Sequence, residues 1–270
     1  MRLHVERGAA GSAVRVRTRS SLLAPRILRV TPTSARVALV ATTALLLAGD
    51  AVELDVVVGE GVELELVEVA ATVAYAGRGG SCSWAANLTV AEGASLRWPG
   101  EPFVVATDAR ATRTTHADVA DGGSLVLRDT LVLGRHGETG GELVARTDIV
   151  HAGRPALVEE FHLSPQDDAP GIRGGHRVVD QVTTIGAAGI SPRAPGPVTR
   201  ADAARPGVAA SGAARSGAAT PGAAPSDVMT PGPAAAGGDV PAGVTRLDLI
   251  ASGHVDRWLG DDVHRSPLRS

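Results

Sequence analysis

A nine-residue pattern built around a glycine recurs along the chain. It is VGEGVELEL at residues 58–66, VAEGASLRW at 90–98, VADGGSLVL at 119–127 and, more loosely, VHAGRPALV at 150–158. The aligned glycines are Gly61, Gly93, Gly122 and Gly153, which follow one another at intervals of 32, 29 and 31 residues. Units of this length cannot bury both of their faces alone and must stack on their neighbours. The repeat therefore predicts a β-solenoid body or a layered β-sandwich. An ordinary all-β protein with glycine turns is the alternative, and the matching Val, Gly and Leu positions favour the repeat.

The residues on either side of these glycines alternate between apolar and polar. Val52, Leu54, Val56 and Val58 share one face of a predicted strand, opposite Glu53 and Asp55. After Gly61, Leu64 and Leu66 alternate with Glu63 and Glu65, which predicts a half-buried hairpin. The same pattern continues to Leu163 without a helix-period segment, so the fold class is predicted to be all-β with few helices. The acidic cluster Glu53, Asp55, Glu60, Glu63, Glu65 and Glu68 is interpreted as the solvated face of this hairpin, with a cation site as the alternative.

Composition divides the chain into three parts. Residues 187–243 consist mostly of Ala, Gly and Pro and contain no aromatic residue. Such a segment cannot bury enough apolar surface to offset its ordering entropy, so we expect a disordered linker or insertion. Residues 1–186 are the predicted β-helix-like body, and residues 244–264 are predicted to supply one or more strands that complete it.

Charge and cysteine usage exclude several classes of protein. The 26 basic residues are all Arg, and there are 29 acidic residues, so the net charge is −3. This balance disfavours nucleic-acid binding. The single cysteine, Cys82, rules out an intrachain disulfide and suggests a reducing compartment, so we expect a cytoplasmic protein. The apolar run at residues 37–48 is too short to span a membrane and is predicted to be a buried pair of strands.

No motif for catalysis is present. The sequence lacks GxSxG, HExxH and GxxxxGK[ST], and without lysine it can form neither a Schiff base nor a Walker site. The eight histidines are scattered, and only His136 lies in a suggestive loop, where a surface turn explains it as well. We therefore expect no enzyme activity, no tightly bound cofactor and no firm metal site. An enzyme with an unrecognised site remains an alternative.

Several stretches together resemble one family, the urease accessory protein UreD, also called UreH. Residues 44–50, ALLLAGD, look like its GGxxxGD motif, with Ala44 and Leu45 in place of the usual glycine pair. Residues 69–75, VAATVAY, are similar to its T-x-x-A-T-x-x-Y segment. The remaining matches are WPGEPF at 98–103, LVLGR at 131–135 followed by Glu138, GRPALVE at 153–159 and VDRWLGD at 255–261.

The resemblance implies a non-enzymatic scaffold with a β-helix-like body. Members of the family bind apo-urease and a helical partner, UreF, which recruits the GTPase UreG that delivers nickel. The resemblance also implies that nickel passes through an internal channel, so the ion would be in transit rather than stored. The matched polar positions are candidates for the nickel path or for partner contacts: Asp50, Tyr75, Arg135, Glu138 and Glu159. A β-solenoid module for another partner is the competing interpretation.

Overall fold

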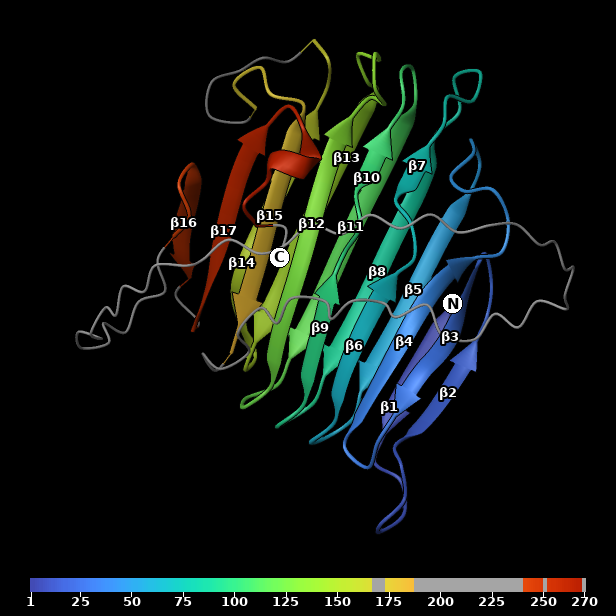
Figure 1. Ribbon diagram of the computed structural model, residues 1–270, viewed down its shortest axis with the longest axis vertical. Helices are drawn as coiled ribbons and strands as arrows, with labels where there is room; N and C mark the ends of the chain where they lie inside the picture. The colour runs from blue at the N-terminus through green and yellow to red at the C-terminus, as the bar shows by residue number, and fades with distance from the viewer. Residues whose placement is uncertain (167–172, 187–239, 250–251, 269–270) are drawn as a thin grey trace, which may run out of the picture. The chain divides into compact units, whose positions relative to one another are not determined.

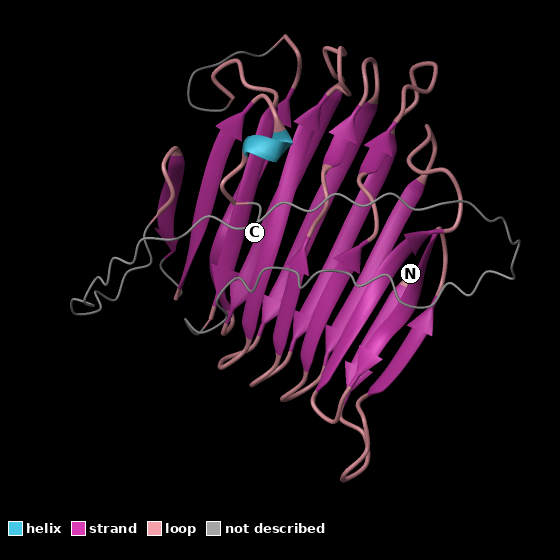
Figure 2. Cartoon of the chain, viewed as in Figure 1, coloured by secondary structure: helices cyan, strands magenta, loops and turns pink. Residues whose placement is uncertain are grey.

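The computed structural model describes residues 1–166, 173–186, 240–249 and 252–268, and it is nearly all strand. Figure 2 shows strands throughout these residues and a single helical turn, η1 (Val263–Arg265). The described residues belong to one compact unit formed by 1–192 and 240–270. Most of the predicted linker, 187–239, lies outside the described residues.

Seven strands form the first sheet, in the order β14-β13-β11-β8-β5-β1-β2. Their bounds are β1 (Arg2–Glu6), β2 (Arg15–Arg19), β5 (Ala51–Val58), β8 (Cys82–Val90), β11 (Arg110–Val119), β13 (Glu142–His151) and β14 (Arg154–Leu163). The four strands β5, β8, β11 and β13 run parallel and in unbroken register (Figure 1).

The second sheet has ten strands, with the main order β16-β17-β15-β12-β9-β6-β4-β3. Their bounds are β3 (Leu23–Val30), β4 (Ser34–Ala41), β6 (Glu63–Glu68), β7 (Thr72–Ala74), β9 (Ser95–Pro99), β10 (Phe103–Val105), β12 (Ser124–Leu133), β15 (Val178–Ile185), β16 (Val244–Leu249) and β17 (Gly253–Gly260). The short strands β7 and β10 pair with each other, and β10 also pairs with β12. Here β4, β6, β9 and β12 run parallel.

The chain alternates between the two sheets from β4 to β13, so each pair of strands is one coil of a β-solenoid of about four turns. The predicted all-β, solenoid-like fold is confirmed. Alternation also placed the core correctly, because Val52, Leu54, Val56 and Val58 are all buried. Inward-facing aliphatic side chains from both sheets form one continuous core.

The predicted hairpin around Gly61 is wrong. Strands β5 and β6 lie in different sheets, so the glycine turn carries the chain across the core instead of returning it beside itself. Gly61, Gly93 and Gly122 have positive φ values of 60°, 62° and 69°. The turns stack, since the Gly61 amide donates to the carbonyl of Glu92 at 3.1 Å.

The fourth glycine, Gly153, behaves differently. It follows Ala152, and both residues have positive φ, 48° and 74°. Two consecutive positive φ values make a type I′ turn, which joins antiparallel neighbours in one sheet. β13 and β14 accordingly pair as an antiparallel hairpin.

The apolar run at 37–48 forms one buried strand rather than two. Its first part lies in β4, and residues 42–50 continue as a loop in which Leu46 is fully buried. At the other end of the body, β17 pairs with β15 and β16 pairs with β17, both antiparallel.

We expect Gly93→Ala to destabilise the fold by about 1–2 kcal/mol, because an L-residue with positive φ brings its Cβ close to the backbone. A Cβ at this position would itself fit, since its nearest neighbour, the Gly61 Cα, would be 3.9 Å away. Gly93→Asn is the matched control, because Asn tolerates this conformation and should lose less. Urea unfolding measures both variants. Equal losses for Ala and Asn would show that backbone strain is not the cause.

Candidate functional site

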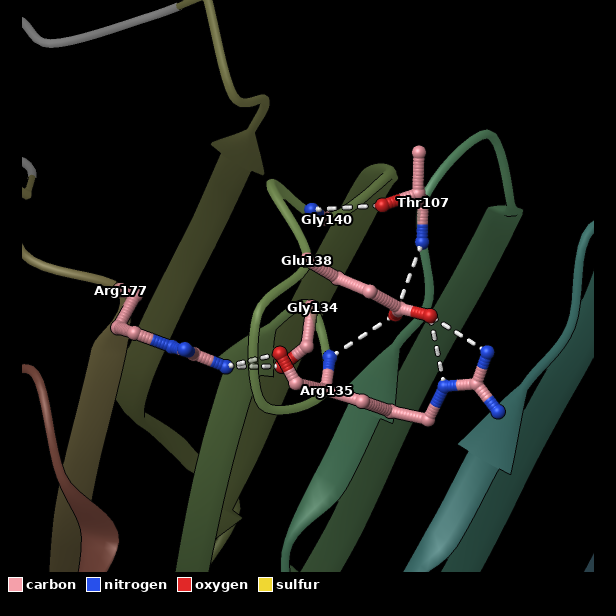
Figure 3. Close-up of polar contacts among 6 residues, drawn as sticks. All are labelled: Thr107, Gly134, Arg135, Glu138, Gly140 and Arg177. Carbon is pink, nitrogen blue, oxygen red and sulfur yellow. Dashed lines mark hydrogen bonds and ion pairs between the residues drawn. The ribbon is translucent and has the colours of Figure 1, made fainter.

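A tight loop at residues 134–140 joins β12 to β13 at one rim of the solenoid. Glu138 organises it, because its carboxylate accepts hydrogen bonds from the Arg135 amide at 3.0 Å and the Arg135 Nε at 2.9 Å. The same carboxylate accepts from the Thr107 amide at 3.3 Å, which ties the loop to the turn before β11 (Figure 3). On the other side, the Arg177 Nη2 donates to the carbonyls of Gly134 and Arg135. The loop is therefore held from two sides.

Three of the five predicted site residues meet at this rim. The guanidinium of Arg135 lies over the ring of Tyr75, 5.6 Å from its centroid, while pairing with Glu138. Tyr75 follows β7, and its amide donates to the Leu46 carbonyl at 2.9 Å. Asp50 belongs to the loop that contains Leu46, where its carboxylate accepts from the Leu47 amide at 2.7 Å and closes a turn.

The charge of Glu138 is strongly favoured in the fold. Hydrogen bonds from the Arg135 side chain, then from the Arg135 amide, lower its pKa to about 2. A lowered folded-state pKa means that the stabilisation is present above the ordinary pKa of 4.5 and is lost as pH falls toward 2.

Removing this charge should loosen the rim loop locally. We expect Glu138→Gln to speed hydrogen exchange of the Arg135 and Thr107 amides at neutral pH, because the two amides lose their charged acceptor. In the unmodified chain the same two amides should become less protected as pH falls from 4.5 toward 2. Glu142→Gln is the control, since Glu142 makes an exposed ion pair with Arg110. Unchanged protection in the Glu138 variant would contradict the assignment.

A row of polar side chains crosses the aliphatic core between β11, β12, β13 and β15. Arg113 and Asp129 form a buried ion pair, with 2.6 Å between Nη2 and Oδ1. The Arg113 guanidinium also lies 5.7 Å from the Trp84 ring centroid and 5.3 Å from that of Phe103. A small cavity next to this pair is lined by Thr115, Thr147 and Gln181, among others.

The fifth predicted residue, Glu159, lies at the other end of this row. Arg257 of β17 binds the Glu159 carboxylate through Nη2 and the Gln181 side chain at 2.9 Å, and it lies over the Phe161 ring at 4.8 Å. The second oxygen of Glu159, Oε2, is buried and has no hydrogen-bond partner among the residues that the structure describes. The structure thus separates Glu159 from the rim cluster of Tyr75, Arg135 and Glu138.

Comparison with known proteins identifies the family. The model of the UreD urease accessory protein family matches residues 1–267. The chain belongs to the UreD family. It is 44% identical over 208 residues to urease accessory protein UreD 1 of Streptomyces griseus, covering 75% of this chain and 80% of that protein. It is also 33% identical over 183 residues to UreD of Streptomyces avermitilis, covering 66% and 73% of the two chains.

Membership of UreD assigns the chain a role in urease maturation. UreD proteins are accessory proteins, which is consistent with a chain that is not itself an enzyme. Among the described residues no group of three or more His, Cys, Asp or Glu could hold a metal ion. His136 is exposed, and burial raises the pKa of the Cys82 thiol, which disfavours the thiolate that binds metals. No helix within the described ranges is long and apolar enough to cross a membrane.

The sequence interpretation of this UreD chain missed three charged residues that point into the interior. The alternation of inward and outward positions along the strands could have identified them. Asp129 shares the inward face of β12 with Leu127 and Leu131, and Arg113 shares that of β11 with Ala111. Glu68 likewise follows Leu64 and Leu66 inward, so it does not belong to the solvated acidic face. A charged residue at a core position of a strand is the pattern that would have found all three.

Proposed function

We propose that this UreD chain is a scaffold of urease maturation that binds apo-urease and a UreF-like partner, through which a UreG-like GTPase delivers nickel. The family match supports the role in maturation. The rim cluster of Tyr75, Arg135 and Glu138 supports a docking role, because it is held rigid before any partner arrives and carries Arg and Tyr, two residue types enriched at interface hot spots.

We further propose that nickel passes through the interior along the polar row between Asp129 and Glu159. The observation that carries this proposal is the buried Glu159 Oε2, a carboxylate oxygen without a partner among the described residues, beside an otherwise aliphatic core. A path for an ion needs oxygen ligands that replace its hydration but bind weakly enough to release it. The lack of a three-ligand cluster among the described residues fits transit rather than storage.

The scaffold proposal is tested by capture of apo-urease with the tagged full chain, with and without a UreF-like protein. We expect a ternary complex and activation of urease when UreG, GTP and nickel are added. The chain alone should show no turnover. Failure to capture apo-urease under either condition would overturn the scaffold proposal.

The transit proposal predicts that Glu159→Ala lowers urease activation several-fold while the complex with apo-urease still assembles. The reason is that the variant removes Glu159 Oε2, the buried oxygen without a hydrogen-bond partner among the described residues, from the polar row. Nickel-dependent urease activity measures the loss of activation. Glu160→Ala is the matched control, since Glu160 lies next along β14 but pairs with exposed Arg146 and His162. Nickel titration of the unmodified chain should show only weak binding. A sub-micromolar site, or full activation by Glu159→Ala, would contradict transit along this row.

A further inference from the structure

Positive charge is concentrated in the first strands of the chain. Residues 1–49 contain eight arginines and one acidic residue, Glu6, a net charge of +7, whereas the whole chain carries −3. Here β2 is the edge strand of the first sheet and β3 the edge strand of the second (Figure 1). The Val14 amide, just before β2, donates to the Thr31 carbonyl, just after β3, at 2.8 Å, so the two edges lie together. We call the surface formed by β2 and β3 the end face.

Aliphatic side chains on the core side of β3 are exposed at the end face. Ile27 lies opposite Val37 of β4, and Val30 lies opposite Ala35. Val37 and Ala35 belong to the core, and residues directly opposite each other in an antiparallel pair share a face. Ile27 and Val30 are nevertheless 51% and 40% exposed, and Leu28 between them is 54% exposed. The apolar core therefore reaches the surface here.

Arginines border this apolar surface on both sides. On β2, Val16 lies opposite the core residue Val5, so the alternating arginines point to the outer face of the first sheet. On β3, Arg29 lies opposite Arg36, which pairs with Glu65 on the outer face of the second sheet. The bordering residues are Arg15, Arg17 and Arg19 from β2 and Arg26 and Arg29 from β3.

Little of this charge is neutralised within the described part of the chain. Glu6 pairs with Arg15 at 3.5 Å and with Arg17 at 2.8 Å. Within the same described residues, Arg19, Arg26 and Arg29 make no ion pair. Charge complementarity thus selects an acidic partner for the end face.

A partner would have to bind through side chains, because β3 is a poor template for another strand. Pro25 lacks an N–H, and the bulge at Leu28 interrupts regular pairing, two features that protect sheet edges. Edge strands of two packed sheets lie roughly 5–10 Å apart, so an α-helix of about 10–12 Å diameter covers both. The exposed residues 26–30 extend over roughly 15 Å, or about three helical turns.

We propose that the end face is a docking surface for an acidic amphipathic helix of a partner protein. The apolar stripe of the helix covers Ile27, Leu28 and Val30, and acidic residues beside the stripe meet the arginines of the two sheets. An apolar centre with a charged border rich in Arg is typical of protein interfaces. A second copy of the chain would bring like charges together. The end face shares no residue with the rim cluster or the polar row, so the inference does not depend on the passage of nickel.

A model peptide tests the proposal on the full chain without urease or nickel. The probe is a helical peptide of about 14 residues, with Leu along one stripe and Glu on both sides of it. In a chain methyl-labelled at Ile, the Ile27 resonance should shift and saturate as this peptide is added. The resonances of Ile149 and Ile185, which are buried in the core, should stay constant. Added salt should weaken binding several-fold, because the bordering charges are exposed.

Three controls separate the end face from general stickiness. The same peptide with Lys in place of Glu should not shift the Ile27 resonance. Leu28→Glu should weaken binding of the Glu peptide by about tenfold or more, and the variant should fold because Leu28 is exposed. Val158→Glu is the matched control, since Val158 is also an exposed aliphatic residue but lies on β14 at the other end of the first sheet. It should bind the peptide as the unmodified chain does.

An Ile27 resonance that the Glu peptide does not move, or that the Lys peptide moves equally, would overturn the proposal. So would equal losses of binding in Leu28→Glu and Val158→Glu. An Ile27 shift that depends on the concentration of the chain alone would assign the end face to self-association. A response to phosphatidylserine vesicles but not to the Glu peptide would assign it to a membrane surface.

Discussion

Asp129→Ala is expected to remove about 3–5 kcal/mol of folding stability, because it leaves the Arg113 guanidinium buried without its counter-ion. The side chains of Arg113 and Asp129 are only 9% and 7% exposed, so water cannot replace the lost partner without distorting the core. The rings of Trp84 and Phe103 beside the guanidinium offset only a small part of this cost.

Chemical denaturation measures the loss of folding free energy. The midpoint should shift while the m-value stays the same as in the unmodified chain. The double variant Arg113→Met/Asp129→Leu is the decisive control, since apolar residues of similar volume can replace a buried ion pair at little cost. We expect it to be more stable than Asp129→Ala. If the double variant is the less stable of the two, the destabilisation comes from repacking and not from an uncompensated charge.

Asp180→Ala is expected to cost a similar amount, about 3–5 kcal/mol, and to release the C-terminal segment. Asp180 is fully buried and accepts from Arg128 at 3.0 and 2.7 Å, from Thr130 at 2.7 Å and from the hydroxyl of Ser266. It is thus the point at which β12, β15 and the residues after η1 are joined.

Limited proteolysis after residue 260, together with thermal unfolding, measures both effects. Ser266→Ala removes only one neutral donor and should cost about 1 kcal/mol while partly loosening the same segment. Full resistance to proteolysis in Asp180→Ala would show that other contacts hold the C-terminal residues.

The solenoid could be predicted because the two features that define it, strands with one buried face and a turn at a fixed interval, are both visible in short stretches of sequence. Alternation at Val52 to Val58 identified a buried face, and a glycine at a fixed interval identified the turn. What alternation cannot decide is where the chain goes after the glycine. The turns at Gly61 and Gly153 look alike in sequence, yet one crosses the core and the other makes a hairpin, because Ala152 also takes a positive φ.

The candidate site was predictable to a smaller extent. Tyr75 lies 60 residues before Arg135 and 63 before Glu138 in the sequence. All three came from the family resemblance, while their contact depends on how the coils stack. Glu68, Arg113 and Asp129 were visible as polar residues at core positions, but their association needs β6, β9 and β12 to pair in one sheet and β11 of the other sheet to pack opposite them. Such long-range packing is not encoded in any single stretch of sequence.

The reversal at Gly153 has a counterpart at the other end of the stack, where β2 and β3 run antiparallel to β1 and β4. Every parallel coil is therefore enclosed between antiparallel strands. A duplicated coil can be accommodated inside the stack, where it has a parallel coil on each side. At either end of the stack its neighbour would instead be an antiparallel strand. Because β2 and β14 both run opposite to the coils, they run in the same direction as each other, so a second molecule stacked end to end would meet these edge strands and not a coil of the solenoid.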